Sequence, residues 1–476
     1  MIKRRIIRLF EKAAKMSDIK LSDHFTYRRL FRFIMPTVAM MVFSSVYGIV
    51  DGYFVSNYAG KTAFSGINII MPYIMIIASL GFVFGTGGSA LVGKTLGEGK
   101  SEKASELFSM FVYVTVVTGV VIAIAGAVSM DKVAYLCGAR GELQALAARY
   151  GRISMISITA FMLQMEFQSF FITAERPRMG FWMTLMSGVI NILMDLILVG
   201  KLGLGLDGAA WATVMSELAG GLVPLAYFAV KKDLPIRLTA IRFDLPSLKK
   251  GIYNGMSEFI GSITASFVSM LYNFQLLRFA GENGVAAYGV MMYVEMIFMS
   301  LFFGYCMGTA PIISFDYGAN NTEELQNVYT KSLTVIGVSS ALMCAVSLLM
   351  AKNLSELYVG YDRGLYEMTL RGFRIYSFVY LFSGIGCLGS SFFTALNNGL
   401  ISAILSVMRT VVFQIIMVLI LPGILGIDGI WLSLPSAEAA SALLSVAMLI
   451  IFGDRYGYTK KRRKGSEDQT EGSAVP

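Results

Sequence analysis

Two aspartates of this chain lie inside long apolar segments, where an ionised side chain is unfavourable. Asp51 follows an apolar run that begins near Phe31, and Asp195 lies within another such run. An ionised Asp at mid-bilayer costs roughly 2.5–3.5 kcal/mol on insertion scales. A proton neutralises the carboxylate, and Na⁺ offsets its charge, since hard cations prefer carboxylate, amide and hydroxyl oxygens. The chemistry that these residues indicate is reversible binding of H⁺ or Na⁺.

Three further polar side chains are predicted at the same depth. Asn191 precedes Asp195 by four residues, which places both on one helix face. Counting the rise of about 1.5 Å per residue puts Thr213 and Tyr150 at a similar level of their own helices. Asp51, Asn191, Asp195 and Thr213 form a possible Na⁺ ligand set. The alternative is that the two acids are hydrogen-bonded to neighbours and bind no cation.

The composition indicates that these residues lie in segments that span a membrane. Of the 476 residues, 55% are hydrophobic and 15% are charged, and the mean hydropathy is +0.64. Soluble domains carry about 25% charged residues, and apolar runs of about 20 residues span a bilayer. We expect an all-α polytopic membrane protein without a sizeable soluble domain. The N-terminus is too charged for a cleavable signal peptide. The four cysteines have no metal or disulfide spacing, and the only histidine, His24, precedes the first span.

Hydropathy predicts twelve transmembrane helices, and basic segments set their orientation. Lys and Arg gather at the N-terminus, at 231–250 and at 460–464, which places all three segments in the cytoplasm. The net charge of +9 therefore reflects topology and lipid headgroups rather than nucleic acid. The predicted divisions are a basic segment (1–28), an N-lobe (29–230), a linker (231–249), a C-lobe (250–453) and a basic, then polar tail (454–476). The predicted helices are 31–56, 64–93, 105–129, 147–173, 179–200, 207–230, 250–277, 285–313, 327–350, 372–396, 400–421 and 428–452.

The two halves of the chain are an internal repeat. An offset of 221 residues aligns Gly60 with Gly281, Gly87 with Gly308, and Gly97 with Gly318. Six spans in each half make the repeat parallel, as in many secondary transporters. At this offset the second half lacks the acidic cluster, because Asp51 and Asp195 become Tyr272 and Ile416. Glu217 and Glu438 occur in both halves, so we interpret them as mainly structural.

Other acids within the predicted spans are candidates for a second role. Glu166, Glu258 and Glu295 could bind a cationic substrate or a second coupling ion, although packing or hydrogen bonding explains them equally well.

One motif is misleading. Residues 88–95, GSALVGKT, match the phosphate-loop pattern, which needs free backbone N–H groups in a loop between a strand and a helix. Here the match ends an apolar run, so we expect its amides to be bonded within a helix. Asp131, the only apparent metal partner, should lie about 30 Å from Lys94, at the opposite side of the membrane. No nucleotide site is expected.

In combination, the motifs and the repeat resemble the multidrug and toxic compound extrusion (MATE) family. The resemblance covers about residues 28–455 and rests on V50-D-G-Y-F-V-S-N-Y-A-G60, G85-T-G-G-S-A-L-V-G-K-T-L-G-E-G99, N191-I-L-M-D195, G208-A-A-W-A-T213 and S390-S-F-F-T-A-L-N-N-G399. It implies two six-helix lobes around a central cleft. It also implies export of cationic amphipathic drugs in exchange for H⁺ or Na⁺. In the branch that it resembles most, the cation-linked residues correspond to Asp51, Tyr150, Asn191, Asp195 and Thr213. Another branch uses acids in spans 7 and 10, but span 10 here contains none.

We therefore predict a secondary antiporter of the multidrug efflux type that works by alternating access and contributes to antibiotic resistance. We expect a monomer in the cell inner (plasma) membrane, with both termini cytoplasmic, in contact with lipids, and with no cofactor beyond the coupling ion. The nearest alternative is a flippase for lipid-linked oligosaccharides, but such a protein would line its cleft with Arg or Lys, and here almost all basic residues stand at span ends. A channel suits the one-sided ion site less well. An enzyme would need a catalytic set that this sequence lacks.

Overall fold

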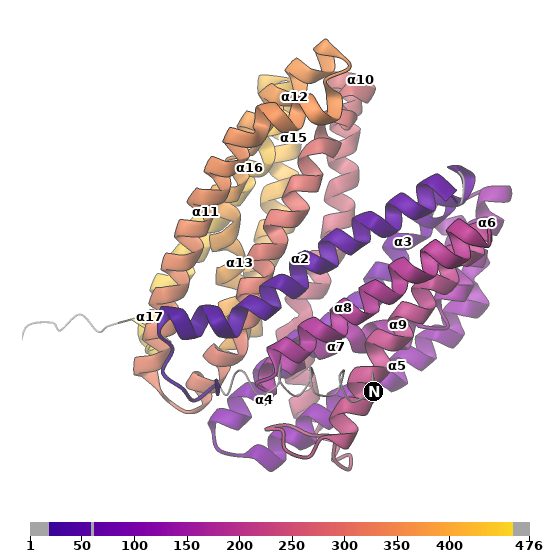
Figure 1. Cartoon of the computed structure of the whole chain (residues 1–476). Helices are drawn as coiled ribbons and strands as arrows, with labels where there is room; N and C mark the ends of the chain where they lie inside the picture. The colour runs from indigo at the N-terminus through magenta and orange to yellow at the C-terminus, as the bar shows by residue number, and fades with distance from the viewer. Residues whose placement is uncertain (1–18, 59–60, 460–476) are drawn as a thin grey trace, which may run out of the picture.

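The computed structural model of the chain describes residues 19–58 and 61–459, and these residues form helices and connecting loops without strands. The helices gather into two lobes that meet at one end, here called the closed end, and diverge toward the other, the splayed end (Figure 1). Most of the basic segment predicted at 1–28 and of the tail predicted at 454–476 lies outside the described residues.

The N-lobe contains the first six spans. The second of these spans contains a π-helical turn, η1, and the fifth contains another, η2. The fourth span is broken, since α6 and α7 meet at an angle of 59°. The elements are α2 (Tyr27–Tyr58), α3 (Lys61–Phe82), η1 (Val83–Gly87), α4 (Gly88–Gly97), α5 (Ser101–Leu136), α6 (Glu142–Ser154), α7 (Ile158–Thr173), α8 (Pro177–Met194), η2 (Asp195–Lys201) and α9 (Gly205–Val230).

The C-lobe repeats this pattern. Its broken span is the pair α12 and α13, bent by 42°, at the position that matches α6 and α7 in the repeat. The elements are α10 (Leu245–Gly318), α11 (Thr322–Val359), α12 (Arg363–Tyr376), α13 (Val379–Ala395), α14 (Gly399–Val407), η3 (Met408–Phe413), α15 (Gln414–Leu425), α16 (Ile427–Ile451) and the short α17 (Gly453–Tyr456).

The helix α10 is two spans rather than one. Its 74 residues would extend about 110 Å at 1.5 Å per residue, far beyond a hydrocarbon core of about 30 Å. The chain reverses at Gly281, whose φ of 62° and ψ of −152° are not helical and favour glycine. Within the described residues, nine helices are long and apolar enough to span a membrane, eleven with the two bent pairs. Dividing α10 at Gly281 gives the predicted twelve.

A loop of residues 231–244 joins α9 to α10 and ends in a capped helix start. The Asp244 carboxylate accepts hydrogen bonds from the Ser247 backbone N–H (3.2 Å) and hydroxyl (2.7 Å). These bonds favour the charged form and lower the pKa of Asp244. The cap satisfies a helix N–H that would otherwise lack a partner.

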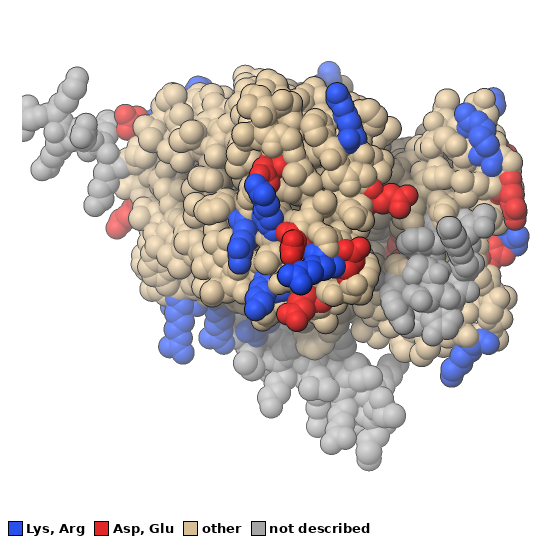
Figure 2. Space-filling model, turned by 90° about the horizontal axis from the view of Figure 1, so that it is seen from above, with Lys and Arg blue, Asp and Glu red and all other residues tan. Residues whose placement is uncertain are grey.

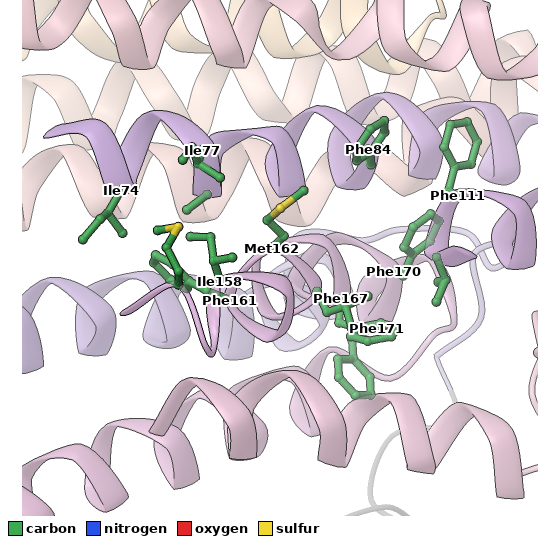
Figure 3. Close-up of a cluster of buried hydrophobic side chains, with 14 of the residues drawn as sticks. Ile74, Ile77, Phe84, Phe111, Ile158, Phe161, Met162, Phe167, Phe170 and Phe171 are labelled. Atoms are coloured by element: carbon green, nitrogen blue, oxygen red, sulfur yellow. The ribbon is translucent and has the colours of Figure 1, made fainter. Parts of the chain in front are cut away.

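Aromatic side chains fill the centre of the N-lobe. Phe167, Phe170 and Phe171 on α7 lie against Phe108 on α5 and Phe228 on α9, with ring centroids 4.8–6.5 Å apart. Figure 3 shows Phe167, Phe170 and Phe171 together with the Ile, Met and Phe side chains that lie along α3, η1 and the preceding part of α7. Edge-to-face and tilted pairs of this kind suit the ring quadrupoles. The broken α7 is thereby fixed among its neighbours.

Glycines bring the two lobes into backbone contact at the closed end. A Cβ placed on Gly97 would lie 2.0 Å from the Phe315 carbonyl oxygen, and one on Gly318 would lie 2.0 Å from the Lys94 carbonyl oxygen. Each contact is the repeat image of the other, because both residue pairs are related by the offset of 221. A Cβ on Gly87 would lie 2.0 Å from the Gly251 oxygen. We call these contacts the glycine seam. Their reciprocity is the signature of a two-fold axis that relates the lobes.

The phosphate-loop match lies in this seam and not in a loop. Gly88 has helical φ and ψ, and residues 88–97 form α4, so their amides are bonded within the helix as expected. Lys94 lies 3.8 Å from Glu98 and 5.2 Å from the centre of the Tyr317 ring. Asp131 pairs with Arg152 instead.

The chain just before α2 connects the two lobes at the closed end. The Leu21 backbone N–H donates to Glu175, between α7 and α8, at 2.8 Å. The Phe25 N–H donates to Glu324, at the start of α11, at 2.8 Å, and His24 Nδ1 lies 2.6 Å from the other oxygen of that carboxylate. Leu21 and Phe25 are buried in the C-lobe core. Residues 19–26, here called the strap, are therefore anchored to both lobes.

Replacing Gly97 with Val should destabilise the glycine seam. The added side chain overlaps the α10 backbone, so the lobes must separate or distort at about 1–3 kcal/mol, as in other overpacked sites. Thermal unfolding of the detergent-purified protein measures this. Gly337→Ala is the matched control, because no atom lies within 4 Å of a Cβ there. Equal melting temperatures for the two variants would contradict the seam.

Replacing Glu324 with Ala should release the strap. The buried Phe25 N–H loses its acceptor, which costs about 1–3 kcal/mol. Hydrogen exchange of the amides at 21–25 should accelerate about tenfold for each 1.4 kcal/mol by which the free energy of local opening falls. Glu323→Ala, at the exposed neighbouring position, should leave exchange unchanged. Similar exchange in both variants would show that Glu324 does not anchor the strap.

Candidate functional site

Asp51, Asn191 and Asp195 meet between α2 and the junction of α8 with η2. The Asp51 carboxyl group interacts with the side chains of both Asn191 and Asp195. Asp195 is 0% exposed and Asn191 is 2% exposed, whereas Asp51 is partly exposed. Two acids from different helices thus share one largely dry position.

Several oxygens of this group have no hydrogen-bond donor. Both carboxylate oxygens of Asp195, the Asn191 Oδ1 and one Asp51 oxygen are buried without a partner. Burying an acceptor without a donor destabilises the folded protein by about 1–3 kcal/mol, and by more when the acceptor is charged. Carboxylate and amide oxygens are the ligands that hard cations prefer. The oxygens present therefore fit a bound Na⁺, or a proton shared between the acids.

The backbone changes form where Asp195 stands. The π-helical turn η2 begins at Asp195 and extends to Lys201. π-Helical turns inside α-helices occur frequently at functional sites. The turn begins at the residue whose side chain meets Asp51 of α2.

Tyr150 and Thr213 complete the predicted set. The hydroxyl groups of the two residues interact, and the charge of Asp51 acts on Tyr150. Tyr150 is buried on α6, and Thr213 on α9 also donates to the Ala209 carbonyl oxygen at 3.1 Å. The structure thus gathers the five residues from α2, α6, α8–η2 and α9. We call them the N-lobe cluster.

Three neighbours of the N-lobe cluster were not among the predicted site residues. Glu217 on α9 and Tyr47 on α2 lie close enough to Asp51 for electrostatic interaction. Ser157 donates to the Glu217 carboxylate at 2.6 Å. Glu217 follows Thr213 by four residues on the same helix, and this spacing was the signal that could have identified it.

The C-lobe contains a different polar group with a basic residue at its centre. Arg409 Nε lies 3.0 Å from both Glu438 oxygens, and Arg409 Nη1 lies 2.9 Å from the Cys387 sulfur. The charges of Glu258 and Glu295 also interact with Arg409, and the Tyr376 hydroxyl donates to Glu295. Arg409 is an exception to the prediction that basic residues stand at span ends, because it is 11% exposed within the eleventh span.

The three acids of possible second function lie in different surroundings. Glu258 and Glu295 are partly exposed in the C-lobe. Glu166 is fully buried on α7, and neither of its oxygens meets the geometric criteria for a hydrogen bond, although Thr115 lies beside it. Among the described residues, no three Asp, Glu, His or Cys side chains converge closely enough to hold a metal ion together. A cation in the N-lobe cluster would therefore need the amide and hydroxyl groups as well as the acids.

A family model matches this chain twice, once in each half. The MatE model matches residues 36–197 and 259–420, which is more than half of the chain. The chain belongs to the MATE family. The paired matches confirm the repeat found in the sequence, and the apolar helices make it a multi-pass membrane protein.

Relatives and solved structures of MATE proteins cover most of the chain. The multidrug export proteins MepA of Staphylococcus aureus (strain MRSA252) and of Staphylococcus saprophyticus are each 24% identical over 434 residues, 90% of this chain and 94% of theirs. A crystal structure of a MATE protein in complex with MaL6 has a TM-score of 0.85 at 22% identity, covering 90% of this chain and 97% of that one. An outward-facing multidrug resistance MATE transporter gives 0.85 at 22% identity, covering 90% and 96%. These structures confirm the two-lobe fold of twelve helices.

Replacing Asp195 with Asn should remove cation-dependent stability. Wild-type protein should melt at a higher temperature when Na⁺ is added or when the pH is lowered, because a ligand that binds only the folded state stabilises it. The variant keeps the shape of the side chain but has no charge, so the response to that ion should fall several-fold. Asp131→Asn, which lies outside the cluster, should respond as the wild type does. A full response in Asp195→Asn would exclude this residue from the ion site.

Proposed function

We propose that this protein is a secondary antiporter that exports cationic amphipathic compounds in exchange for H⁺ or Na⁺. The observation that supports this most is the approach of Asp51 and Asp195 in one lobe of a MATE fold, where three of their four carboxylate oxygens are buried without a hydrogen-bond partner. The named relatives are multidrug export proteins, which supports the same activity here. The coupling ion is the only cofactor in this proposal, and the protein is a transporter rather than an enzyme.

The N-lobe cluster couples the ion to the movement of the lobes. When the acids are ionised, their repulsion and lost hydration destabilise any state in which they are close and dry. A bound proton or Na⁺ removes this penalty and so favours that state. An ion can shift the equilibrium between outward-open and inward-open forms only through such a difference in affinity.

The acids of the C-lobe provide the complementary site for the exported compound. Glu258 and Glu295 are partly exposed, and their carboxylates outnumber the one guanidinium beside them. An excess of negative charge suits an organic cation. The flippase alternative, with its anionic pyrophosphate, is less compatible with this charge balance.

The arrangement of the lobes fits an outward-facing state of a monomer in the inner membrane. The basic loop at 231–244 and the strap lie at the closed end, which the distribution of Lys and Arg assigns to the cytoplasm. The splayed end then faces outward. Seen from this end, Lys, Arg, Asp and Glu side chains gather on the ends of the helices, where headgroups and water would meet them (Figure 2).

Asp51→Asn should abolish gradient-driven transport while leaving the protein folded. The substitution keeps the size of the side chain but removes the charge that binds the coupling ion. Ethidium efflux from reconstituted vesicles, driven by a set pH or Na⁺ gradient, measures this, and the gradient that drives efflux names the ion. Transport should fall at least tenfold. Asp207→Asn, at an Asp paired with Arg149 near the helix end, is the control.

Undiminished transport by Asp51→Asn would contradict the N-lobe cluster and direct attention to Glu258 and Glu295. A wild-type protein that is folded but transports no cationic dye under either gradient would contradict the antiport proposal itself.

A further inference from the structure

The repeat offers an internal comparison for Glu217, the acid that was interpreted as structural because it occurs in both lobes. Its repeat partner Glu438 is 4% exposed and is held by the Arg409 guanidinium at 3.0 Å. Glu217 is 7% exposed, and no Lys, Arg or His of the described residues pairs with it. The carboxylate at this position is therefore neutralised by a permanently charged arginine in the C-lobe, and it has no such partner in the N-lobe.

The packing shows that this difference is built into both lobes. At the offset of 221, Arg409 corresponds to Gly188. A Cβ on Gly188 would lie 2.6 Å from the Phe43 ring and 3.2 Å from the Tyr47 ring, so aromatic side chains of α2 occupy the place that Arg409 takes in the C-lobe.

A second difference between the lobes makes room for Arg409 in the C-lobe, where a glycine replaces a larger residue. A Cβ on Gly386 would lie 3.4 Å from the Cδ and Nε atoms of Arg409, so the glycine allows the long side chain to pass. The residue that corresponds to Gly386 in the N-lobe is Met165. The two positions therefore carry Met165 and Gly188 in the N-lobe but Gly386 and Arg409 in the C-lobe, and this exchange leaves room for a guanidinium beside Glu438.

Glu217 nevertheless lies among polar and ionisable side chains. Ser157 donates to one carboxylate oxygen, and Asp51, Tyr47 and Tyr150 lie within electrostatic range. Yet Asp51, Asp195 and Glu217 do not converge as ligands of a single metal ion. Glu217 is therefore not a ligand of a metal ion held by both Asp51 and Asp195.

We propose that Glu217 is a further coupling residue, which takes up an exchangeable positive charge of its own in place of the fixed guanidinium that neutralises Glu438. The N-lobe then binds one more positive charge per transport cycle than Asp51 and Asp195 account for. This charge is H⁺ or Na⁺, and the inference rests on the proposed antiport function.

The test compares the number of ions exchanged per dye molecule in the variant with that in the wild type, so the wild-type number need not be known in advance. With the membrane potential set to zero, the steady-state dye gradient equals the ion gradient raised to a power n, the number of ions exchanged per dye. Glu217→Gln should lower n by about one, so a tenfold ion gradient should sustain about tenfold less dye accumulation. A variant that transports with an unchanged n overturns the proposal.

A second measurement applies if Glu217→Gln is folded but inactive. The dependence of the unfolding free energy on the logarithm of ion concentration reports the number of ions bound to the folded protein in detergent. This number should be lower by about one in Glu217→Gln, and an equal number overturns the proposal. Glu217→Asp, which keeps the carboxylate, should restore the lost ion.

The repeat supplies the matched control. The double variant Arg409→Met and Glu438→Gln removes the C-lobe pair together, so that neither member of the pair is left without the other. It should leave n and the number of bound ions unchanged, and a decrease like that of Glu217→Gln would overturn the assignment to Glu217. A wild-type protein that transports no dye would instead refute the antiport function on which the inference depends.

Discussion

The carboxyl groups of Asp51 and Asp195 approach each other in an apolar interior without a fixed positive charge, and both lose hydration there. This arrangement is unfavourable in isolation, since like charges repel and unpartnered acceptors lose their hydrogen bonds with water. The rest of the N-lobe maintains it. The packed aromatic centre fixes α7 and its neighbours, and η2, which begins at Asp195, packs against α2. Under the proposed function, this penalty makes the preferred conformation of the site depend on whether a cation is bound.

The two lobes share one fold but have solved the problem of buried acids differently. In the C-lobe, Arg409 neutralises Glu438 within the protein, whereas Asp51, Asp195 and Glu217 pair with no Lys, Arg or His of the described residues. A repeat alignment alone suggests similarity at this position, because Glu217 and Glu438 are the same residue type. The difference arises from residues that do not align in type, Gly188 with Arg409 and Met165 with Gly386. Divergence of a duplicated fold can therefore reside in the packing around a residue that has not changed.

The sequence predicted the twelve spans and the approach of Asp51, Asn191, Asp195, Thr213 and Tyr150, because hydropathy places helices and helical rise places residues along them. Arg409 lies inside the predicted span 400–421 but was not singled out as a polar group of the interior, since one cation in a run of apolar residues barely changes mean hydropathy. The repeat offset aligned Gly87 with Gly308 and Gly97 with Gly318, but nothing in the sequence states which backbone each glycine meets. That information is tertiary, as is the course of the strap from Glu175 to Glu324.

The glycine seam holds the lobes together through backbone atoms at van der Waals distance, and this determines how the contact fails. Dispersion attraction declines so steeply that a gap of 0.5–1 Å already removes about a quarter to a half of it. A seam of this kind resists small separations and then yields abruptly, unlike long flexible side chains that stay in touch as two surfaces drift apart. Under the proposed alternating access, partly opened forms would therefore be scarce, and small ions would have little opportunity to leak through while the lobes exchange positions.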